Sequence, residues 1–161
     1  MEKIPSFAVD HLKLEKGVYV SRKDVAGGEV LTTFDLRFTK PNAEPVMDTA
    51  AVHAVEHLWA TFFRNDPDWK DKTVYFGPMG CRTGFYLILK GDLQPRDIVP
   101  LLQRACRFLL DFAGEIPGAR AKDCGNYLDM NLSMAKYYTR RYFIEVLENA
   151  SDDRMRYPVT E

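Results

Sequence analysis

The sequence predicts a single domain that contains both helices and strands, and three observations support this. Residues 29–38 alternate between apolar and polar side chains, the period of two that is typical of a strand with one buried face. Residues 48–64 and 95–113 instead carry apolar side chains at helical spacing. A length of 161 residues suits one domain whose core needs no disulfide staples. We therefore expect one domain over residues 1–161.

Turn and capping residues set the expected boundaries of the other elements. Gly27-Gly28 suits a reversal between two strands, Asp48 and Asn131 suit helix N-caps, and Gly114 suits a helix end. A further short strand is expected to begin at Cys124. The remaining elements, in chain order, are strands at 17–22, 73–76 and 84–90 and a last helix at 132–149.

Composition and charge argue against several classes of protein. The net charge of −1 gives no basic surface for nucleic acid or an anionic membrane. No apolar run approaches the roughly 18 residues of a membrane span, and residues 1–5 lack the apolar core of a signal peptide. The three cysteines are odd in number and widely spaced, which favours a reducing, cytoplasmic setting.

The most informative motif is the run from His53 to His57, which has the spacing H-x-x-E-H. On a helix, residues four apart share a face, so His53 and His57 can offer two imidazoles to one point, with Glu56 beside them. Two imidazoles beside a carboxylate suit zinc or iron. The same spacing occurs in inverzincin peptidases, and it also fits a helix with two exposed histidines.

Two histidines leave a metal short of ligands, because a catalytic tetrahedral site needs a third and an open fourth position. The sequence leaves the third open among Cys124, Cys81 and the many carboxylates. Cys81 lies in a loop with three glycines and a proline, residues 77–84, where a cation near the thiol would favour its chemistry. Cys106 falls in an apolar helical stripe and is read as core.

Taken together, these motifs resemble the S-ribosylhomocysteine lyase family, the LuxS type. The resemblance covers nearly the whole chain, and the motifs come in the family's order at close to its separations. The segments that carry it are His53-Ala54-Val55-Glu56-His57, Pro78-Met79-Gly80-Cys81-Arg82-Thr83-Gly84-Phe85-Tyr86, Cys124-Gly125, Phe34-Asp35-Leu36-Arg37-Phe38 and Ser6-Phe7-Ala8-Val9-Asp10-His11.

The resemblance implies an α+β subunit with an antiparallel sheet packed against helices, a LuxS/MPP-like metalloenzyme fold. It also implies a homodimer with its active sites at the interface. The family's metal is ferrous iron, for which zinc or cobalt can substitute. The implied roles are metal ligation by His53, His57 and Cys124, acid/base catalysis by Glu56 and Cys81, and substrate contacts by Ser6, His11 and Arg37.

The reaction implied is cleavage of the thioether of S-ribosylhomocysteine. Two carbonyl shifts and a β-elimination would release homocysteine and 4,5-dihydroxy-2,3-pentanedione, the autoinducer precursor. This chemistry links the methyl cycle to quorum sensing and needs no other cofactor and no macromolecular partner besides a second subunit. The alternatives are an inverzincin-like metallopeptidase and a non-catalytic metal-binding homologue.

The chain departs from the family pattern just before the Cys81 loop. Tyr75-Phe76-Gly77-Pro78 stands where members commonly have Asp-Ile-Ser-Pro, and that aspartate is associated with the homocysteine end of the substrate. Thr33 likewise stands where some members have a lysine. These differences concern contacts to the substrate's tail, whereas the proposed catalytic set is intact.

Overall fold

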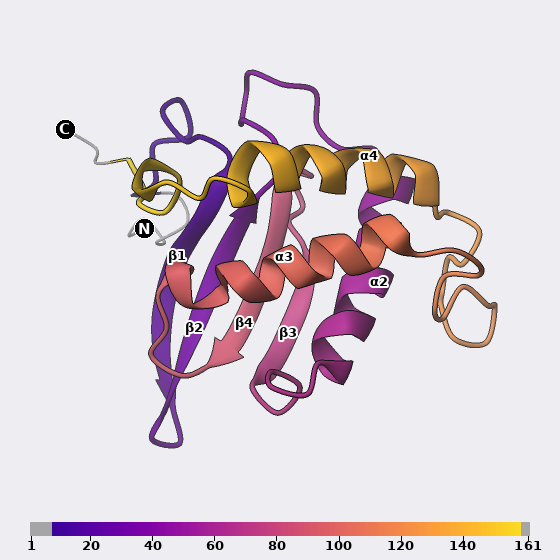
Figure 1. Cartoon of the computed structure of the whole chain (residues 1–161), viewed down its shortest axis with the longest axis horizontal. Helices are drawn as coiled ribbons and strands as arrows, with labels where there is room; N and C mark the ends of the chain where they lie inside the picture. Colours follow the sequence, from indigo (N-terminus) through magenta and orange to yellow (C-terminus); the bar gives the residue numbers. More distant parts are fainter. Residues whose placement is uncertain (1–7, 159–161) are drawn as a thin grey trace, which may run out of the picture.

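One antiparallel sheet with helices on a single face makes up the fold (Figure 1). The computed structural model describes residues 8–158. The strand order is β1-β2-β4-β3, and each neighbouring pair is antiparallel. This confirms the α+β class. The elements are β1 (Gly17–Ala26), β2 (Glu29–Arg37), α2 (Thr49–Asn65), β3 (Thr73–Pro78), β4 (Gly84–Lys90), α3 (Pro95–Asp111), α4 (Leu132–Tyr142), the π-helix η1 (Phe143–Leu147) and the 3-10 helix η2 (Asp152–Arg154).

The predicted hairpin turn and helix N-caps form where the sequence placed them, whereas α3 ends at Asp111, with Phe112 as its C-cap, before the predicted stop at Gly114. Gly27 and Gly28 have φ of +58° and +84° and join β1 to β2, in a conformation that residues with a Cβ adopt rarely. The Asp48 carboxylate accepts the Ala51 N–H at 2.9 Å and caps α2. The Asn131 side chain accepts the Met134 N–H at 3.0 Å and caps α4.

Several boundaries differ from the prediction. The residues around Cys124 form turns rather than a strand, because their N–H groups bond to nearby carbonyls, as that of Cys124 bonds to Arg120 O at 3.0 Å. Strand β1 runs beyond residue 22 to the hairpin turn, since β2 pairs with it throughout. The last helix becomes a π-helix from Phe143, which the apolar pattern did not indicate.

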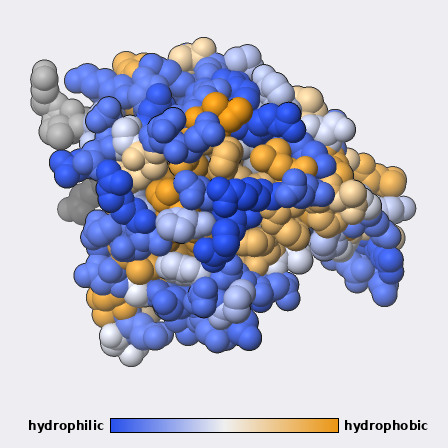
Figure 2. All heavy atoms as spheres, viewed as in Figure 1, coloured by the Kyte–Doolittle hydropathy of each residue, from blue (hydrophilic) through white to orange (hydrophobic). Residues whose placement is uncertain are grey.

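The hydrophobic core lies between the helices and one face of the sheet. Alternate side chains of β2 and β4, such as Phe34 and Leu87, point into it and are fully buried. Trp59 of α2 is fully buried against Phe38 and Phe76. The outer surface of this helical layer is mainly hydrophilic, with apolar side chains showing in the middle and on the right of the view (Figure 2). None of the helices within residues 8–158 has the length and apolarity to cross a membrane.

The opposite face of the sheet carries the residues that alternate with the core positions. Asp35 and Arg37 of β2 lie on it, together with Tyr86 and Ile88 of β4. Tyr75 of β3 pairs with Ile88 and is 47% exposed. We call this the open face, because helices α2, α3 and α4 all pack against the other side (Figure 1).

We expect Gly84→Ala to lower the free energy of unfolding by about 1–3 kcal/mol, because the added methyl overpacks the sheet. A Cβ on Gly84 would lie 2.3 Å from the Leu36 carbonyl oxygen, inside the β2–β4 ladder. Gly80→Ala is the matched control, since nothing lies within 4 Å of a Cβ there. Urea unfolding of the metal-free, reduced protein measures both, and equal midpoints would contradict the expectation.

Candidate active site

Helix α2 and the loop after α3 bring three metal-ligand side chains together. One ligand atom from each of His53, His57 and Cys124 lies within 4.8 Å of the other two. Cys124 Sγ is 3.4 Å from His53 Nε2. A tetrahedral site with metal–nitrogen and metal–sulfur bonds near 2.1 and 2.3 Å separates such atoms by about 3.5 Å. The donor set therefore fits a divalent transition metal.

Backbone carbonyls orient both imidazoles. His53 Nδ1 lies 2.9 Å from Asp129 O, and His57 Nδ1 lies 2.7 Å from Pro117 O. A carbonyl oxygen only accepts, so each Nδ1 carries the proton and donates it. Both Nε2 atoms are then left with a lone pair for a metal, the arrangement that fixes metal-binding histidines elsewhere. The Asn126 N–H donates to Cys124 Sγ at 3.4 Å and orients the third ligand.

Sequence reasoning missed these supporting residues. The proline and glycine at 117 and 118 are typical of a turn, but no local pattern places that turn against α2. Gly118 has φ of +75°, and a Cβ on it would lie 3.1 Å from His57 Nδ1. The left-handed φ and the close approach to His57 both favour glycine at position 118. The Pro117 carbonyl can reach His57 only because no side chain lies between them.

Glu56 shares a pocket with the two histidines. The half-buried Glu56 lines a hollow of about 540 Å³ together with His53, His57 and Phe76. It stands one turn from His53 on the same side of α2, which places the carboxylate beside any ligand of a metal held there. The arrangement suits a group that moves protons to and from such a ligand.

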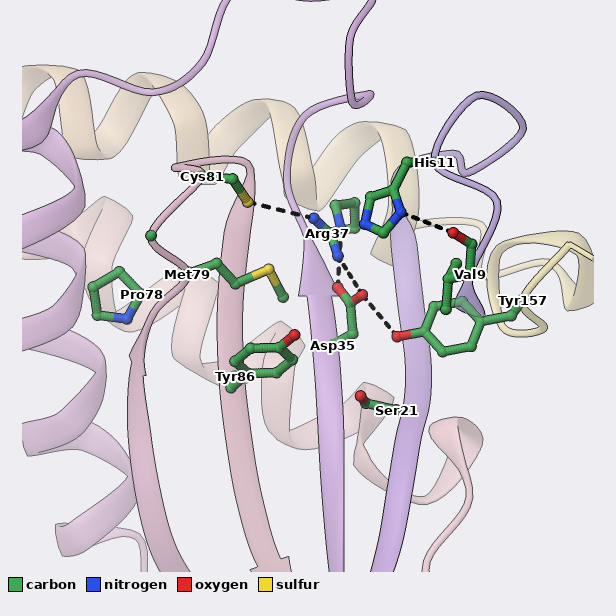
Figure 3. A pocket seen from close by; sticks show the side chains of 11 residues that line it. Val9, His11, Ser21, Asp35, Arg37, Pro78, Met79, Cys81, Tyr86 and Tyr157 are labelled. Atoms are coloured by element: carbon green, nitrogen blue, oxygen red, sulfur yellow. Dashed lines mark hydrogen bonds and ion pairs between the residues drawn. The ribbon is translucent and has the colours of Figure 1, made fainter. Parts of the chain in front are cut away.

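Cys81 lies in a second pocket, at the tip of the β3–β4 hairpin. Its side chain is exposed, and its loop is tight, with Met79 N donating to Gly84 O at 3.0 Å and Arg82 at φ of +59°. Cys81 Sγ is 3.1 Å from Thr83 Oγ1 and 3.9 Å from Arg37 Nη1. Figure 3 shows Cys81 and Arg37 facing each other among the residues that line this pocket, whose volume is about 340 Å³.

Arg37 is held by an ion pair beneath the pocket. Its Nε and Nη2 donate to the two carboxylate oxygens of Asp35 at 3.1 and 2.6 Å, and Nη1 donates to Thr83 Oγ1 at 2.6 Å. Asp35 is 1% exposed and Arg37 3%. Burial by itself favours a lower pKa for Arg37, but the charge and hydrogen bonds of Asp35 outweigh it and raise the pKa. A permanent cation therefore faces Cys81.

The predicted substrate contacts divide between described and undescribed residues. The half-buried His11 lines the Cys81 pocket, and its Nδ1 lies 2.9 Å from Val9 O. Ser6 lies outside the described residues. Tyr75 lies on the open face, where its hydroxyl and ring edge occupy the space that a Cβ on Gly77 would fill. Tyr75 and Gly77 are thus sterically linked.

Within one chain the structure forms two separate groups of predicted site residues. His53, Glu56, His57 and Cys124 gather around α2, whereas His11, Arg37 and Cys81 gather at the open face. The two pockets have no lining residue in common.

Comparison with known proteins identifies the family. Residues 4–153 match the family described as S-ribosylhomocysteinase (LuxS). The chain belongs to the LuxS family. LuxS relatives named S-ribosylhomocysteine lyase include those of Clostridium acetobutylicum, 63% identical over 98% of this chain and 99% of the relative, and of Phocaeicola vulgatus, 55% identical over the full length of both. These relatives give no support to the peptidase alternative, and the His–His–Cys group accords with a metal-dependent family.

We expect Gly118→Ala to weaken metal binding by about 10–100-fold, the usual effect of disturbing a group that orients a metal ligand. The methyl would press on His57 and displace the Pro117 carbonyl. Gly114→Ala is the matched control, because Gly114 also has a left-handed φ, +104°, but nothing lies within 4 Å of its Cβ. Competition with a chelator for Co²⁺ measures both affinities, and equal losses would contradict the role given to Gly118.

Proposed function

We propose that this chain is an S-ribosylhomocysteine lyase that cleaves the substrate's thioether to give homocysteine and 4,5-dihydroxy-2,3-pentanedione. The observation that carries the proposal is the high identity, over essentially the whole chain, to relatives that bear this name. The geometry supports it independently, because a metal-ligand group beside a carboxylate and a thiol beside a guanidinium are the parts that the chemistry needs.

The proposed metal ligands are His53, His57 and Cys124, and the proposed native metal is Fe²⁺, with Zn²⁺ or Co²⁺ as substitutes. A divalent metal here would supply Lewis acidity toward the sugar's carbonyl and hydroxyl oxygens and so acidify the neighbouring C–H groups. With two neutral imidazoles and one thiolate as its ligands, a divalent metal would keep a net positive charge.

Glu56 and Cys81 are the proposed proton carriers. Proton removal at one sugar carbon and return at its neighbour moves the carbonyl from C1 to C2, and a repeat moves it to C3. Loss of the C4 proton then expels homocysteine from C5, and the departing thiolate takes up a proton. Each step needs a base on one side and an acid on the other, and a carboxylate and a thiol can serve alternately. His11, Arg37 and Ser6 are the proposed contacts to the substrate.

We further propose a homodimer of single-domain subunits, residues 1–161, with a LuxS/MPP-like fold and its active sites at the interface. Glu56 and Cys81 line different pockets of one chain, so a second subunit is the natural way to bring them to one substrate. The open face offers the surface, since Tyr75 and the half-buried Tyr86 and Ile88 lie on it without a helix above them.

The proposed setting is the cytoplasm. All three cysteines are free thiols, and the function assigns Cys81 and Cys124 roles that oxidation would abolish. The proposed product is the autoinducer precursor used in quorum sensing, and homocysteine would return to the methyl cycle.

The direct test loads the full chain with Fe²⁺ under anaerobic conditions, adds S-ribosylhomocysteine and follows free thiol against time. We expect thiol release that falls by at least about a hundredfold in Cys81→Ala and in Glu56→Gln, because each removes a proton carrier. Both variants should keep bound metal, whereas Cys124→Ala should lose it. No thiol release from metal-loaded wild type would reject the lyase, and equal metal loss in the Cys81 and Cys124 variants would reject our assignment of the thiols.

Mixing the two inactive variants tests the shared site. If Glu56 of one subunit works with Cys81 of the other, a dimer of Glu56→Gln and Cys81→Ala chains contains one intact site. Random exchange should then restore about a quarter of wild-type activity. Subunits unfolded and refolded together would be compared with the same variants refolded apart and then combined. An absence of recovery in co-refolded mixed dimers would show that each site uses groups of one chain.

A further inference from the structure

The Cys81 pocket has a wall that none of the roles above uses. Tyr157, between η2 and the end of the described residues, lines this pocket together with Asp35, Arg37 and Cys81 (Figure 3). Its hydroxyl donates to Asp35 Oδ2 at 2.8 Å. The family match ends at residue 153, before this tyrosine. The contact is therefore made by a segment that the family match does not reach.

Tyr157 is held in place by its own contacts. Its ring stacks on that of Tyr19, with 4.9 Å between centroids and 15° between planes. Tyr19 is 1% exposed, and its hydroxyl donates to Glu15 O at 3.0 Å, so the ring on which Tyr157 stacks is itself fixed. Upstream, the Arg154 guanidinium donates to Lys16 O at 3.1 Å and ties η2 to the start of β1. The Tyr157 hydroxyl thus reaches Asp35 from a defined direction.

Asp35 transmits this constraint to Arg37. Its two oxygens accept Nε and Nη2 of Arg37, and Oδ2 also accepts the Tyr157 hydroxyl. A buried ion pair is stable only when its remaining hydrogen-bonding capacity is satisfied, and a neutral donor does this without adding a second cation. Burial and the charge of Asp35 raise the pKa of Tyr157, so the hydroxyl keeps its proton and remains a donor.

Arg37 then faces the thiol. With Nε and Nη2 occupied by Asp35, the direction of Nη1 is fixed by the plane of the guanidinium, toward Thr83 Oγ1 and Cys81 Sγ. Without the Tyr157 hydroxyl, the Asp35 carboxylate can rotate about its Cβ–Cγ bond and the guanidinium plane turns with it. A small rotation of the Asp35 carboxylate changes the distance from Arg37 Nη1 to Cys81 Sγ, because Nη1 is the guanidinium nitrogen that Asp35 does not hold.

We propose that Tyr157 is a positioning residue, which acts through Asp35 to hold the Arg37 guanidinium against Cys81. This rests on the proposed function in that Cys81 carries protons during turnover. The segment after η2 therefore takes part in catalysis without contacting the reacting atoms.

The test compares Tyr157→Phe with Tyr142→Phe in the Fe²⁺-loaded full chain. Both substitutions remove one hydroxyl from a hydrogen-bonded tyrosine, and Tyr142 donates to Gly17 O at 3.0 Å, in the core. We expect Tyr157→Phe to lower kcat/KM by about tenfold, as misplacement of a catalytic group does, and Tyr142→Phe to leave it within about twofold.

A second readout needs no turnover. The rates at which Cys81 is alkylated by anionic iodoacetate and by neutral iodoacetamide are measured without substrate, and their ratio reports positive charge at the sulfur independently of access. We expect Tyr157→Phe to lower this ratio by at least about threefold, because the guanidinium no longer faces Cys81, and Tyr142→Phe to leave it unchanged. Mass spectrometry assigns the modified thiol.

The outcomes separate the two proposals. An unchanged ratio in Tyr157→Phe overturns the positioning role even if activity falls, since the hydroxyl would then act on the substrate directly. A lowered ratio with no lyase activity in the wild type supports the positioning role and rejects the proposed function. Additive losses of kcat/KM in the double variant Tyr157→Phe/Asp35→Asn would also overturn it, because a residue that acts through Asp35 adds little once Asp35 is changed.

Discussion

The alternation of side chains along β2 is the constraint on which both the core and the pocket depend. Phe34 and Leu36 point to the helices and are fully buried, and the intervening Asp35 and Arg37 point to the open face. Because the period of a strand is two, a shift of register by one residue would exchange these sets and bury the ion pair in the apolar core. The packing of the helices therefore fixes where the guanidinium meets Cys81.

The metal-ligand group depends on a different kind of constraint. Helical geometry alone puts His53 and His57 on one face, but it leaves their rings free to rotate. The carbonyls of Asp129 and Pro117 remove that freedom and also determine which nitrogen carries the proton. Both carbonyls belong to the turn-rich loop that supplies Cys124, so this single loop provides one ligand and orients the other two. Its irregular backbone is what allows three contacts to converge on one helix.

The two pockets differ in how their charges are arranged. The hollow beside α2 is lined by His53, His57 and the carboxylate of Glu56, and Cys124 lies next to the two histidines. The chemistry of this group would depend on the metal bound to it. The Cys81 pocket carries its own cation, which Asp35 keeps in place. A lyase of this kind must acidify a C–H group and also move the released proton. The metal-ligand group suits the first of these requirements, and the thiol beside the guanidinium suits the second. In the proposed homodimer, the hollow beside α2 of one subunit and the Cys81 pocket of the other would act on one substrate.

The sequence by itself determined most of the strands and helices, the helix N-caps and the residue types of the site, because these follow from local periodicity and motif spacing. It placed the strands β2 and β4 and the helix α2 within one or two residues. Residue spacing left the third member of the histidine group open, and the family resemblance assigned it to Cys124, which does lie with the histidines. Only the tertiary structure decided that Cys124 stands in turns and that Pro117, Asp129 and Tyr157 support the site. These contacts join residues far apart in the chain, and no local pattern encodes which loops meet.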